Sequence, residues 1–372
     1  MTQEIKLQIK ALRKINHVTQ KELAEALHVS FQTISKWENG ITMPDIHYLP
    51  ELAKFFQVEL EVLLGMKTLE EKKETQDFSS ADYWENQLEC TKNWKMVYFN
   101  DDYLEFLVTK VWNFEDPVHM LDCGCGYGYL AQKIFPYLPE GSTYTGIDVS
   151  DAFLEEGRRI FGEDNKKIRF IKGDIQTCNF QKKYDFIISQ MLLCYLKNPE
   201  TIIEKMIQAL RPRGMLAAID ISLPLADNGF FLADGDTVYQ PQIPNPEKVW
   251  KYAKAQGEMN YRMGTEMAYL FRQKGLKNID ARLSDKVFLY DGNSAEENIE
   301  KLAKYETMIK HLERFEKSYA YYLNRGCCLH EAEAYVKYQE DVLRILKESG
   351  VFLSHASCLY ITWGFLGEQN GG

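Results

Sequence analysis

The stretch MLDCGCGYGYL, residues 120–130, joins a short apolar run to the start of a helical pattern through three glycines. Asp122 precedes the turn, and Gly124, Gly126 and Gly128 alternate with other residues. A glycine-rich turn between a strand and a helix lets the backbone approach a ligand closely. These residues therefore predict a ligand-binding loop at the end of a strand.

Two more acidic residues follow at the ends of apolar runs. Asp148 ends TYTGID about 20 residues after the loop, a spacing at which a carboxylate reaches ribose hydroxyls. Asp174 follows the next run, IRFIKG. Dinucleotide enzymes usually carry G-x-G-x-x-G, whereas this loop reads G-x-G-x-G. The pattern favours a nucleoside ligand with an amino-acid tail and no phosphate, and an NAD or nucleotide-sugar enzyme is the alternative.

Apolar, β-rich runs alternate with helical patterns over residues 81–223. The runs are HMLDCG, TYTGIDV, IRFIKGD, YDFIISQ and GMLAAIDI. Such alternation is typical of a mostly parallel sheet with right-handed crossovers. In residues 224–372 we expect two late strands, IDARLSDKVFLY and SCLYITWGFL, to form a hairpin at the sheet edge. The helical patterns between them predict a cap that covers substrate or forms a dimer face.

Residues 1–66 have only helical patterns, and the polar residues 67–80 read as a linker. Within TQKELAEALHVSFQTISKWENG, residues 19–40, Thr19 and Ser30 are suitable N-caps and Gly40 is a suitable C-terminal stop. Five short amphipathic helices are expected in this block, which makes a compact bundle.

The same stretch has the pattern of two helices joined by a tight turn. Its apolar positions, from Leu23 to Trp37, would be buried, with the small Ala24 where the helices approach. It resembles the helix-turn-helix domains of the phage-repressor/XRE family. The resemblance implies phosphate contacts from Gln20 and Asn39 and base contacts from Phe31, Gln32 and Lys36, with Thr33 also facing outward. It also implies operator DNA as a partner. Because Lys plus Arg roughly balance Asp plus Glu over residues 1–66, non-specific affinity should be weak, and we expect a homodimer on a palindrome. A bundle used only for protein interaction or dimerisation is the alternative.

The elements from MLDCGCGYG to ALRPRGMLAAID agree in order and spacing with class I S-adenosylmethionine-dependent methyltransferases, which have a Rossmann-like α/β fold. This resemblance covers roughly residues 85–223. RPRGM departs from the family, which more often has a glycine pair at that turn. The resemblance implies S-adenosyl-L-methionine as cofactor. It assigns its methionine end to Asp122, Gly124, Gly126 and Gly128, its ribose to Asp148, its adenine to Asp174 and Ile175, and the reacting methyl group to Ser189 and Gln190.

Several observations bear on the methyl acceptor. SQML stands where enzymes that methylate exocyclic base amines have (D/N)PPY, and Cys194 lies in LLCYL without the Pro-Cys of cytosine-C5 enzymes. We therefore expect a small-molecule acceptor, with RNA or protein as a further alternative. No catalytic base can be assigned: His330 and His355 qualify only by residue type. A transcriptional regulator that senses the cofactor without turnover is the other reading.

The net charge of −10 excludes a protein that coats nucleic acid with its whole surface. No apolar run approaches the ~20 residues that span a bilayer, and the charged N-terminal pattern is unlike a secretory signal. We expect a cytoplasmic protein that contacts no membrane. The eight cysteines are scattered without paired CxxC motifs, so no metal site is expected.

Overall fold

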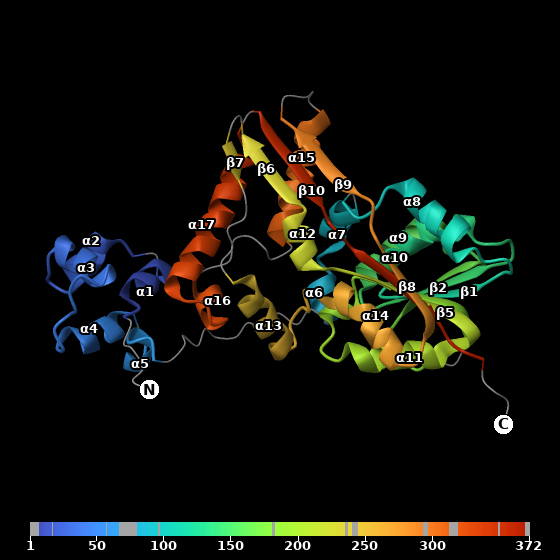
Figure 1. Ribbon diagram of the computed structural model, residues 1–372, viewed down its shortest axis with the longest axis horizontal. Helices are drawn as coiled ribbons and strands as arrows, with labels where there is room; N and C mark the ends of the chain where they lie inside the picture. The colour runs from blue at the N-terminus through green and yellow to red at the C-terminus, as the bar shows by residue number, and fades with distance from the viewer. Residues whose placement is uncertain are drawn as a thin grey trace. The chain divides into compact units, whose positions relative to one another are not determined.

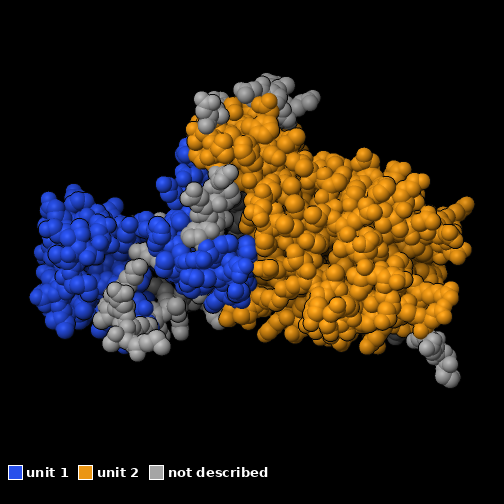
Figure 2. Space-filling view, viewed as in Figure 1, with its two compact units in different colours: residues 1–75, 241–252, 309–344 blue, residues 76–240, 253–308, 345–372 orange. Residues whose placement is uncertain are grey.

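The computed structural model describes residues 7–16, 18–56, 58–66, 80–95, 97–180, 183–234, 237–239, 245–292, 297–311, 319–348 and 350–368. The chain forms two compact units, coloured separately in Figure 2. Unit 1 comprises residues 1–75, 241–252 and 309–344, and unit 2 comprises residues 76–240, 253–308 and 345–372. The predicted range 224–372 is therefore divided between the two units. Of the predicted linker, only Ser80 is among the described residues.

Unit 2 is built on a seven-stranded sheet with the order β3-β2-β1-β4-β5-β11-β8. Strands β1, β2, β5 and β8 of this sheet are labelled in Figure 1. The first five strands in the sheet order are mutually parallel, and β11 runs antiparallel to both its neighbours. This confirms the mostly parallel sheet and the edge hairpin of two late strands. The strands are β1 (His119–Cys123), β2 (Thr143–Asp148), β3 (Ile168–Lys172), β4 (Tyr184–Gln190), β5 (Leu210–Asp220), β8 (Lys277–Leu283) and β11 (Tyr360–Phe365).

The central strands are near-continuous apolar runs because helices cover both faces of a parallel sheet. Leu121, Phe186 and Leu216 are completely buried there. Local signals begin the crossover helices: Ser150 caps one by accepting a hydrogen bond from the Phe153 amide, and Pro199 occupies the first turn of another. These helices are α9 (Tyr129–Ile134), α10 (Asp151–Phe161) and α11 (Pro199–Ala209), with short helices η2 (Phe135–Tyr137) and η3 (Leu193–Tyr195).

Further helices of the described residues precede β1 or lie between β5 and β11 in the sequence. They are α6 (Ala81–Trp84), α7 (Leu88–Lys95), α8 (Asp101–Phe106), the π-helix η1 (Leu107–Trp112), α12 (Leu223–Asn228), α13 (Pro246–Gln256), α14 (Met263–Gln273), α15 (Glu297–His311), α16 (Tyr319–Asn324) and α17 (Leu329–Ile345). Among the described residues, no helix is long and apolar enough to cross a bilayer.

A second, four-stranded antiparallel sheet was not predicted. Its order is β7-β6-β10-β9, with β6 (Phe230–Asp234), β7 (Thr237–Tyr239), β9 (Val287–Asp291) and β10 (Val351–Ala356). The stretch IDARLSDKVFLY, expected to be one strand, is divided at residues 284–286 between β8 of the large sheet and β9 of the small one. The insertion predicted to be a helical cap therefore also contains strands.

The N-terminal block is the predicted bundle of five short helices. They are α1 (Ile9–Ile15), α2 (Gln20–Ala26), α3 (Phe31–Glu38), α4 (Tyr48–Phe55) and α5 (Leu60–Leu63). Thr19 and Glu22 form a reciprocal capping box at α2, and Ser30 caps α3. Leu23, Ile34 and Leu52 lie in one buried core. Within unit 1, Lys10 of α1 also forms a 2.8 Å ion pair with Glu333 of α17.

Candidate functional site

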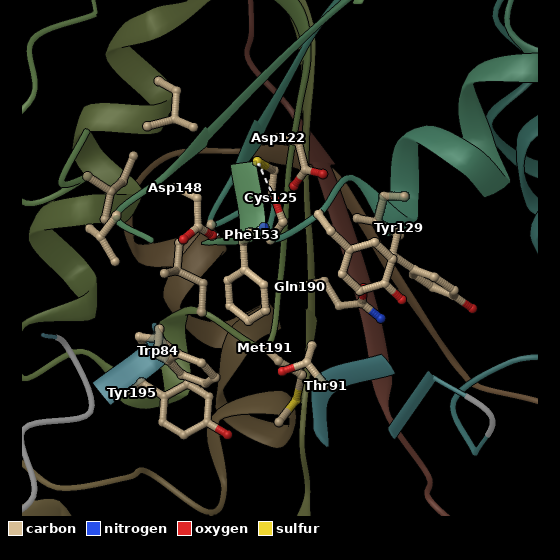
Figure 3. Close-up of a pocket in the computed structure, with 18 of the residues that line it drawn as sticks. Trp84, Thr91, Asp122, Cys125, Tyr129, Asp148, Phe153, Gln190, Met191 and Tyr195 are labelled. Carbon is tan, nitrogen blue, oxygen red and sulfur yellow. Dashed lines mark hydrogen bonds between the residues drawn. The ribbon is translucent and has the colours of Figure 1, made fainter. Parts of the chain in front are cut away.

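A cavity opens in unit 2 at the carboxyl ends of β1, β2 and β4, where ligands of open α/β sheets bind. The space within its lining, including the part open to solvent, is about 920 Å³. Figure 3 shows Asp122 at one end of this cavity and the rings of Trp84 and Tyr195 at the other. Seven of the nine residues predicted to bind the cofactor line it: Asp122, Gly124, Gly126, Asp148, Asp174, Ile175 and Gln190.

The glycine loop after β1 is held against β2 through its backbone. The amides of Gly124 and Cys125 donate to the Ile147 carbonyl at 2.8 and 3.0 Å. Gly126 has a φ of +54°, and a Cβ built on it would meet no atom within 4 Å. The backbone of Gly126 therefore borders open space in the cavity wall, as a ligand-binding loop requires.

The third glycine of the loop has a different role. Gly128 does not line the cavity. Its φ is +81°, and a Cβ there would lie 2.8 Å from the Phe170 ring. Gly128 thus permits close packing of the loop against β3, while Gly126 leaves room for a ligand.

Asp122, at the end of β1, has one satisfied and one free carboxylate oxygen. Its Oδ2 accepts a 2.8 Å hydrogen bond from Tyr144 Oη, whereas its buried Oδ1 has no partner among the described residues. Burial raises the pKa of Asp122 to about 7, against the lowering effects of Tyr144 and of the Lys95 charge. A buried acceptor without a partner is costly unless a ligand supplies the donor.

Asp148, at the end of β2, is fixed by two backbone amides. Its Oδ2 accepts from Gly126 at 2.8 Å and its Oδ1 accepts from Ser150 at 3.0 Å. Burial raises the pKa of Asp148, while these hydrogen bonds favour its charged form. Because each carboxylate oxygen can accept more than one hydrogen bond, Asp148 can still receive donors from the cavity.

After β3, Asp174 and Ile175 reach the same cavity. Asp174 Oδ1 accepts a 2.8 Å hydrogen bond from the Gln176 amide, which fixes the turn, and the Ile175 side chain is buried. An acceptor beside an apolar side chain suits the edge and face of a heterocyclic base.

Three residues singled out from the sequence lie elsewhere. Ser189 is completely buried and does not line the cavity. His330 is exposed on α17, and His355 is buried in β10, where its Nδ1 lies 2.8 Å from Tyr305 Oη. Neither histidine lines the cavity, so neither is placed to exchange a proton with a ligand there.

Helices α6 and α7 supply cavity residues that the sequence did not reveal: Trp84, Thr91, Trp94 and Lys95. The Trp84 and Tyr195 rings meet edge to face with centroids 5.1 Å apart. Tyr127, Tyr129 and Tyr195 line the cavity as well. The only sequence signal for α6 and α7 is the aromatic content of DYWENQLECTKNW, which does not tell which face of a helix meets a cavity.

In unit 1, the six side chains predicted to contact DNA lie on or beside α2 and α3. Phe31 is 51% exposed, and Gln32, Lys36 and Asn39 are also exposed. Gln20 and Thr33 are half-buried; the Thr33 hydroxyl lies 2.8 Å from the Ser30 hydroxyl. These positions leave the outer face of α3 accessible to a partner.

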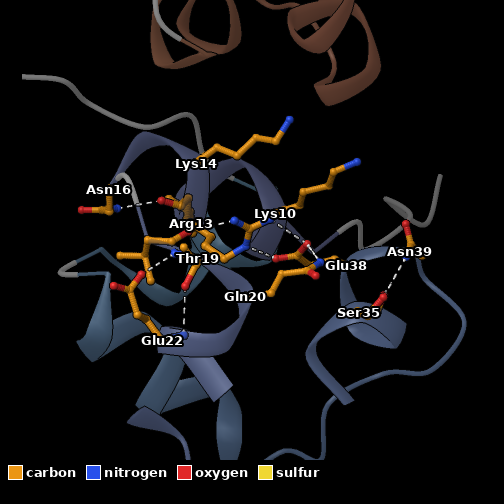
Figure 4. Close-up of polar contacts among 12 residues, drawn as sticks. Lys10, Arg13, Lys14, Asn16, Thr19, Gln20, Glu22, Ser35, Glu38 and Asn39 are labelled. Atoms are coloured by element: carbon orange, nitrogen blue, oxygen red, sulfur yellow. Dashed lines mark hydrogen bonds and ion pairs between the residues drawn. The ribbon is translucent and has the colours of Figure 1, made fainter. Parts of the chain in front are cut away.

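The polar contacts around Gln20 fix α1, α2 and α3 to one another (Figure 4). Gln20 donates to Glu38 Oε2 at 2.6 Å, and Arg13 forms an ion pair with the same carboxylate at 2.5 Å. Asn39 donates to the Ser35 carbonyl at 2.8 Å. Gln20 would have to share or release Glu38 in order to contact a phosphate.

Two family models match the chain. The model described as helix-turn-helix matches residues 9–63, and the model described as methyltransferase domain matches residues 120–214. The chain thus joins an N-terminal helix-turn-helix domain to a methyltransferase domain, which confirms the predicted combination. Among the described residues, no cluster of three or more His, Cys, Asp or Glu side chains could hold a metal ion.

Curated relatives that are named as methyltransferases match just under a third of the chain. Malonyl-[acyl-carrier protein] O-methyltransferase from Priestia megaterium is 31% identical over 103 residues, covering 28% of this chain and 36% of the relative. Ubiquinone biosynthesis O-methyltransferase from Rickettsia canadensis is 26% identical over 115 residues, covering 30% and 48%. The chain spans about a third to a half of the length of these relatives. A structure of Haemonchus contortus phosphoethanolamine N-methyltransferase 2 with S-adenosyl-L-methionine covers 78% of this chain and 60% of its own, at 14% identity and a TM-score of 0.42.

Proposed function

We propose that unit 2 binds S-adenosyl-L-methionine and transfers its methyl group to a small-molecule acceptor, and that residues 9–63 bind operator DNA. The observation that carries the proposal is the cavity at the carboxyl strand ends, which is lined by the open backbone of Gly126 and by the carboxylates of Asp122 and Asp148. Together with Asp174, these carboxylates give one acceptor for each donating part of an adenosyl amino acid: the ammonium, the ribose hydroxyls and the adenine amine.

The residues present fit this cofactor. Asp148 accepts the ribose hydroxyls, Asp174 and Ile175 hold the adenine, and the free Oδ1 of Asp122 accepts the α-ammonium group. At Gly124 and Gly126 the backbone can lie close to the methionine part of the cofactor. Gln190 lies near the methyl group that is transferred. The cofactor carries a net positive charge at neutral pH, which matches a cavity that has three acidic side chains and one lysine.

When bound, the cofactor supplies an electrophilic methyl group on a sulfonium. The protein's contribution is to align the acceptor with that group and to exclude water. The aromatic rings of Trp84, Tyr127 and Tyr195 border the cavity, and such rings stabilise a nearby cation through their faces. They also make an apolar wall for an acceptor of small size.

Two lines of support favour a small-molecule acceptor. The motifs of DNA-base methylation are lacking at the end of β4 and around Cys194, which is completely buried. In addition, several matched relatives are named ubiquinone biosynthesis O-methyltransferase. The eight free thiols suit a reducing compartment, so we place the protein in the cytoplasm.

The N-terminal domain is proposed to read operator DNA with α3 in the major groove. Phe31, Gln32 and Lys36 offer an apolar contact, an amide and a cation to base edges, with Thr33 beside them, while Gln20 and Asn39 contact phosphates. A domain of this size gains specificity when two copies read adjacent half-sites, so a homodimer is the proposed binding form. We further propose that ligand occupancy controls operator affinity.

The second candidate is a transcriptional regulator that binds the cofactor without turnover. The presence of the helix-turn-helix domain in the same chain favours it. Incubating the purified chain with methyl-labelled cofactor and a panel of small metabolites distinguishes the two. Transfer to a small acceptor supports the enzyme; cofactor binding that alters operator affinity without transfer supports the regulator; transfer to RNA or protein overturns both. If cofactor and acceptor leave operator affinity unchanged, the proposed control is wrong.

A further inference from the structure

Helix α7 turns one face towards the cavity, with Thr91 and Lys95 four residues apart on it. Among the described residues that line the cavity, Lys95 is the one with a positive charge. Thr91 Oγ1 is buried and has no hydrogen-bond partner among the described residues. One turn of helix therefore presents a cation and a hydroxyl donor to the cavity.

Lys95 is held in place without an acidic partner. Its Nζ donates to Gln190 Oε1 at 2.9 Å and lies 4.6 Å from the centre of the Tyr129 ring and 5.2 Å from that of Tyr98. Within the described part of the chain, no carboxylate lies within the 4.0 Å of an ion pair with it. Burial lowers the pKa of Lys95 to about 7, and the Asp122 charge opposes that effect. A desolvated cation of this kind is stabilised best by an anion that enters with the ligand.

The opposite charge lies nearby on the sheet. Asp122 and Gln190 are at the ends of the paired strands β1 and β4, and Gln190 is the residue that holds Lys95. Asp122 keeps one oxygen free, and Gln190 Nε2 also has no partner among the described residues. The cavity wall thus has a carboxylate and an ammonium close together, each with unused hydrogen-bonding capacity. An α-amino acid group, with its own ammonium and carboxylate, is complementary to this pair.

We infer that Lys95, with Thr91, binds the carboxylate of the cofactor's amino-acid tail while Asp122 binds its ammonium. This inference rests on the proposed binding of S-adenosyl-L-methionine. It makes α7, which precedes the glycine loop in the chain, part of the cofactor site. It also makes Lys95 a group that distinguishes a complete amino-acid tail from one that lacks the carboxylate.

Another role for Lys95 is to take a proton from the methyl acceptor. The two roles differ in a measurable way, because a proton acceptor has no effect on how the demethylated cofactor binds in the absence of an acceptor. Binding of S-adenosylhomocysteine and of its decarboxylated analogue, S-(5′-adenosyl)-3-thiopropylamine, therefore separates them without any measurement of activity.

The experiment is calorimetric titration of the full chain with both ligands. We expect wild type to bind S-adenosylhomocysteine more tightly than the decarboxylated analogue. Lys95→Met should lower the affinity for S-adenosylhomocysteine by about 10- to 100-fold, because a charge-assisted hydrogen bond is lost. The decarboxylated analogue should bind Lys95→Met with an affinity within about twofold of its affinity for wild type. The variant should therefore lose most of the preference for S-adenosylhomocysteine over the analogue. Thr91→Val should reduce the preference by a smaller factor, and Lys95→Arg should restore part of it.

Lys110→Met is the matched control, because Lys110 is exposed on η1 and does not line the cavity. Thermal melting confirms that each variant is folded. Equal weakening of both ligands by Lys95→Met would assign Lys95 a structural role and overturn the inference, as would an unchanged preference. If wild type binds neither ligand, the proposed function itself fails; if wild type binds S-adenosylhomocysteine and the preference survives Lys95→Met, only this inference fails.

Discussion

Tyr144 Oη lies 2.8 Å from Asp122 Oδ2 and donates a hydrogen bond to it, from β2 to the end of β1. Both side chains are almost completely buried. The bond uses one carboxylate oxygen and leaves the other free towards the cavity, so Tyr144 both orients Asp122 and stabilises its charged form.

Replacing Tyr144 by Phe should make cofactor binding depend differently on pH. Burial already raises the pKa of Asp122 to about 7, and loss of the hydrogen bond would raise it further. The ammonium group of the ligand binds the ionised carboxylate, so affinity for S-adenosylhomocysteine falls as Asp122 is protonated. In Tyr144→Phe this fall should occur at a pH about one unit higher than in wild type. Calorimetry between pH 5.5 and pH 8 measures this shift. Tyr137→Phe, at an exposed position, is the control, and coincident profiles for Tyr144→Phe and wild type would contradict the role of Tyr144.

Alanine at two glycines of the loop should give contrasting phenotypes. At Gly126 the new methyl group points into open space, so Gly126→Ala should cost only about 1 kcal/mol of stability, from its positive φ, yet weaken ligand binding at least about tenfold. At Gly128 it would meet Phe170 at 2.8 Å, which adds an overpacking cost of about 1–3 kcal/mol. Urea unfolding and calorimetry on both variants test this. A stable Gly128→Ala protein, or full affinity in Gly126→Ala, would show that the two roles are wrongly assigned.

The parallel part of the large sheet could be predicted because its strands are unbroken apolar runs between clear helical patterns. The small sheet could not. Its strand β10, VFLSHA, buries His355 at an inward position, and a histidine and a serine weaken the apolar signal. The break between β8 and β9 was equally hidden, because Asp285 in the connecting turn accepts a hydrogen bond from the Asn100 amide, a residue far away in the sequence. Tertiary contacts of this kind do not alter the hydrophobic periodicity of the sequence, so the sequence does not reveal them.

The three acidic residues of the cavity could be found from sequence because Asp122 and Asp148 lie at the ends of strands, Asp174 follows one, and parallel strands end at one edge. Lys95 and Thr91 could not be found in this way. They belong to a helix before the sheet whose inward face is decided only when the fold is complete. Ser189 was expected at the cavity together with Gln190 but does not line it. Successive residues of a strand point to opposite faces, and of these two only Gln190 reaches the cavity.

In the helix-turn-helix domain, Gln32→Ala should relax recognition of one base pair. Gln32 is exposed on α3, and an amide that pairs with a base edge contributes about 1–3 kcal/mol of discrimination. A binding sequence selected from random DNA, followed by titration of single-base variants, measures the loss at one position of each half-site. Lys21→Ala, at an exposed site on α2, should leave the pattern of discrimination unchanged. A uniform loss across all variants after Gln32→Ala would indicate that Gln32 contacts the backbone instead.

Asp220 should make the methyltransferase unit less stable as pH rises. It is buried at the end of β5, where Oδ1 accepts a 3.3 Å hydrogen bond from the Cys194 amide and Oδ2 has no partner among the described residues. Burial raises its pKa from 3.8 to about 7, so the folded state binds the proton more tightly than the unfolded state does. Its favourable contribution is therefore complete below pH 3.8 and is lost as pH rises through about 7. Asp220→Asn removes this titration, so the stability of the variant relative to wild type should increase by about 2 kcal/mol between pH 5.5 and pH 8.5. Urea unfolding at the two pH values measures the difference, with the exposed Asp164→Asn as control. A difference that does not change with pH would mean that Asp220 is already ionised in the folded protein at pH 5.5, with a partner for its second oxygen.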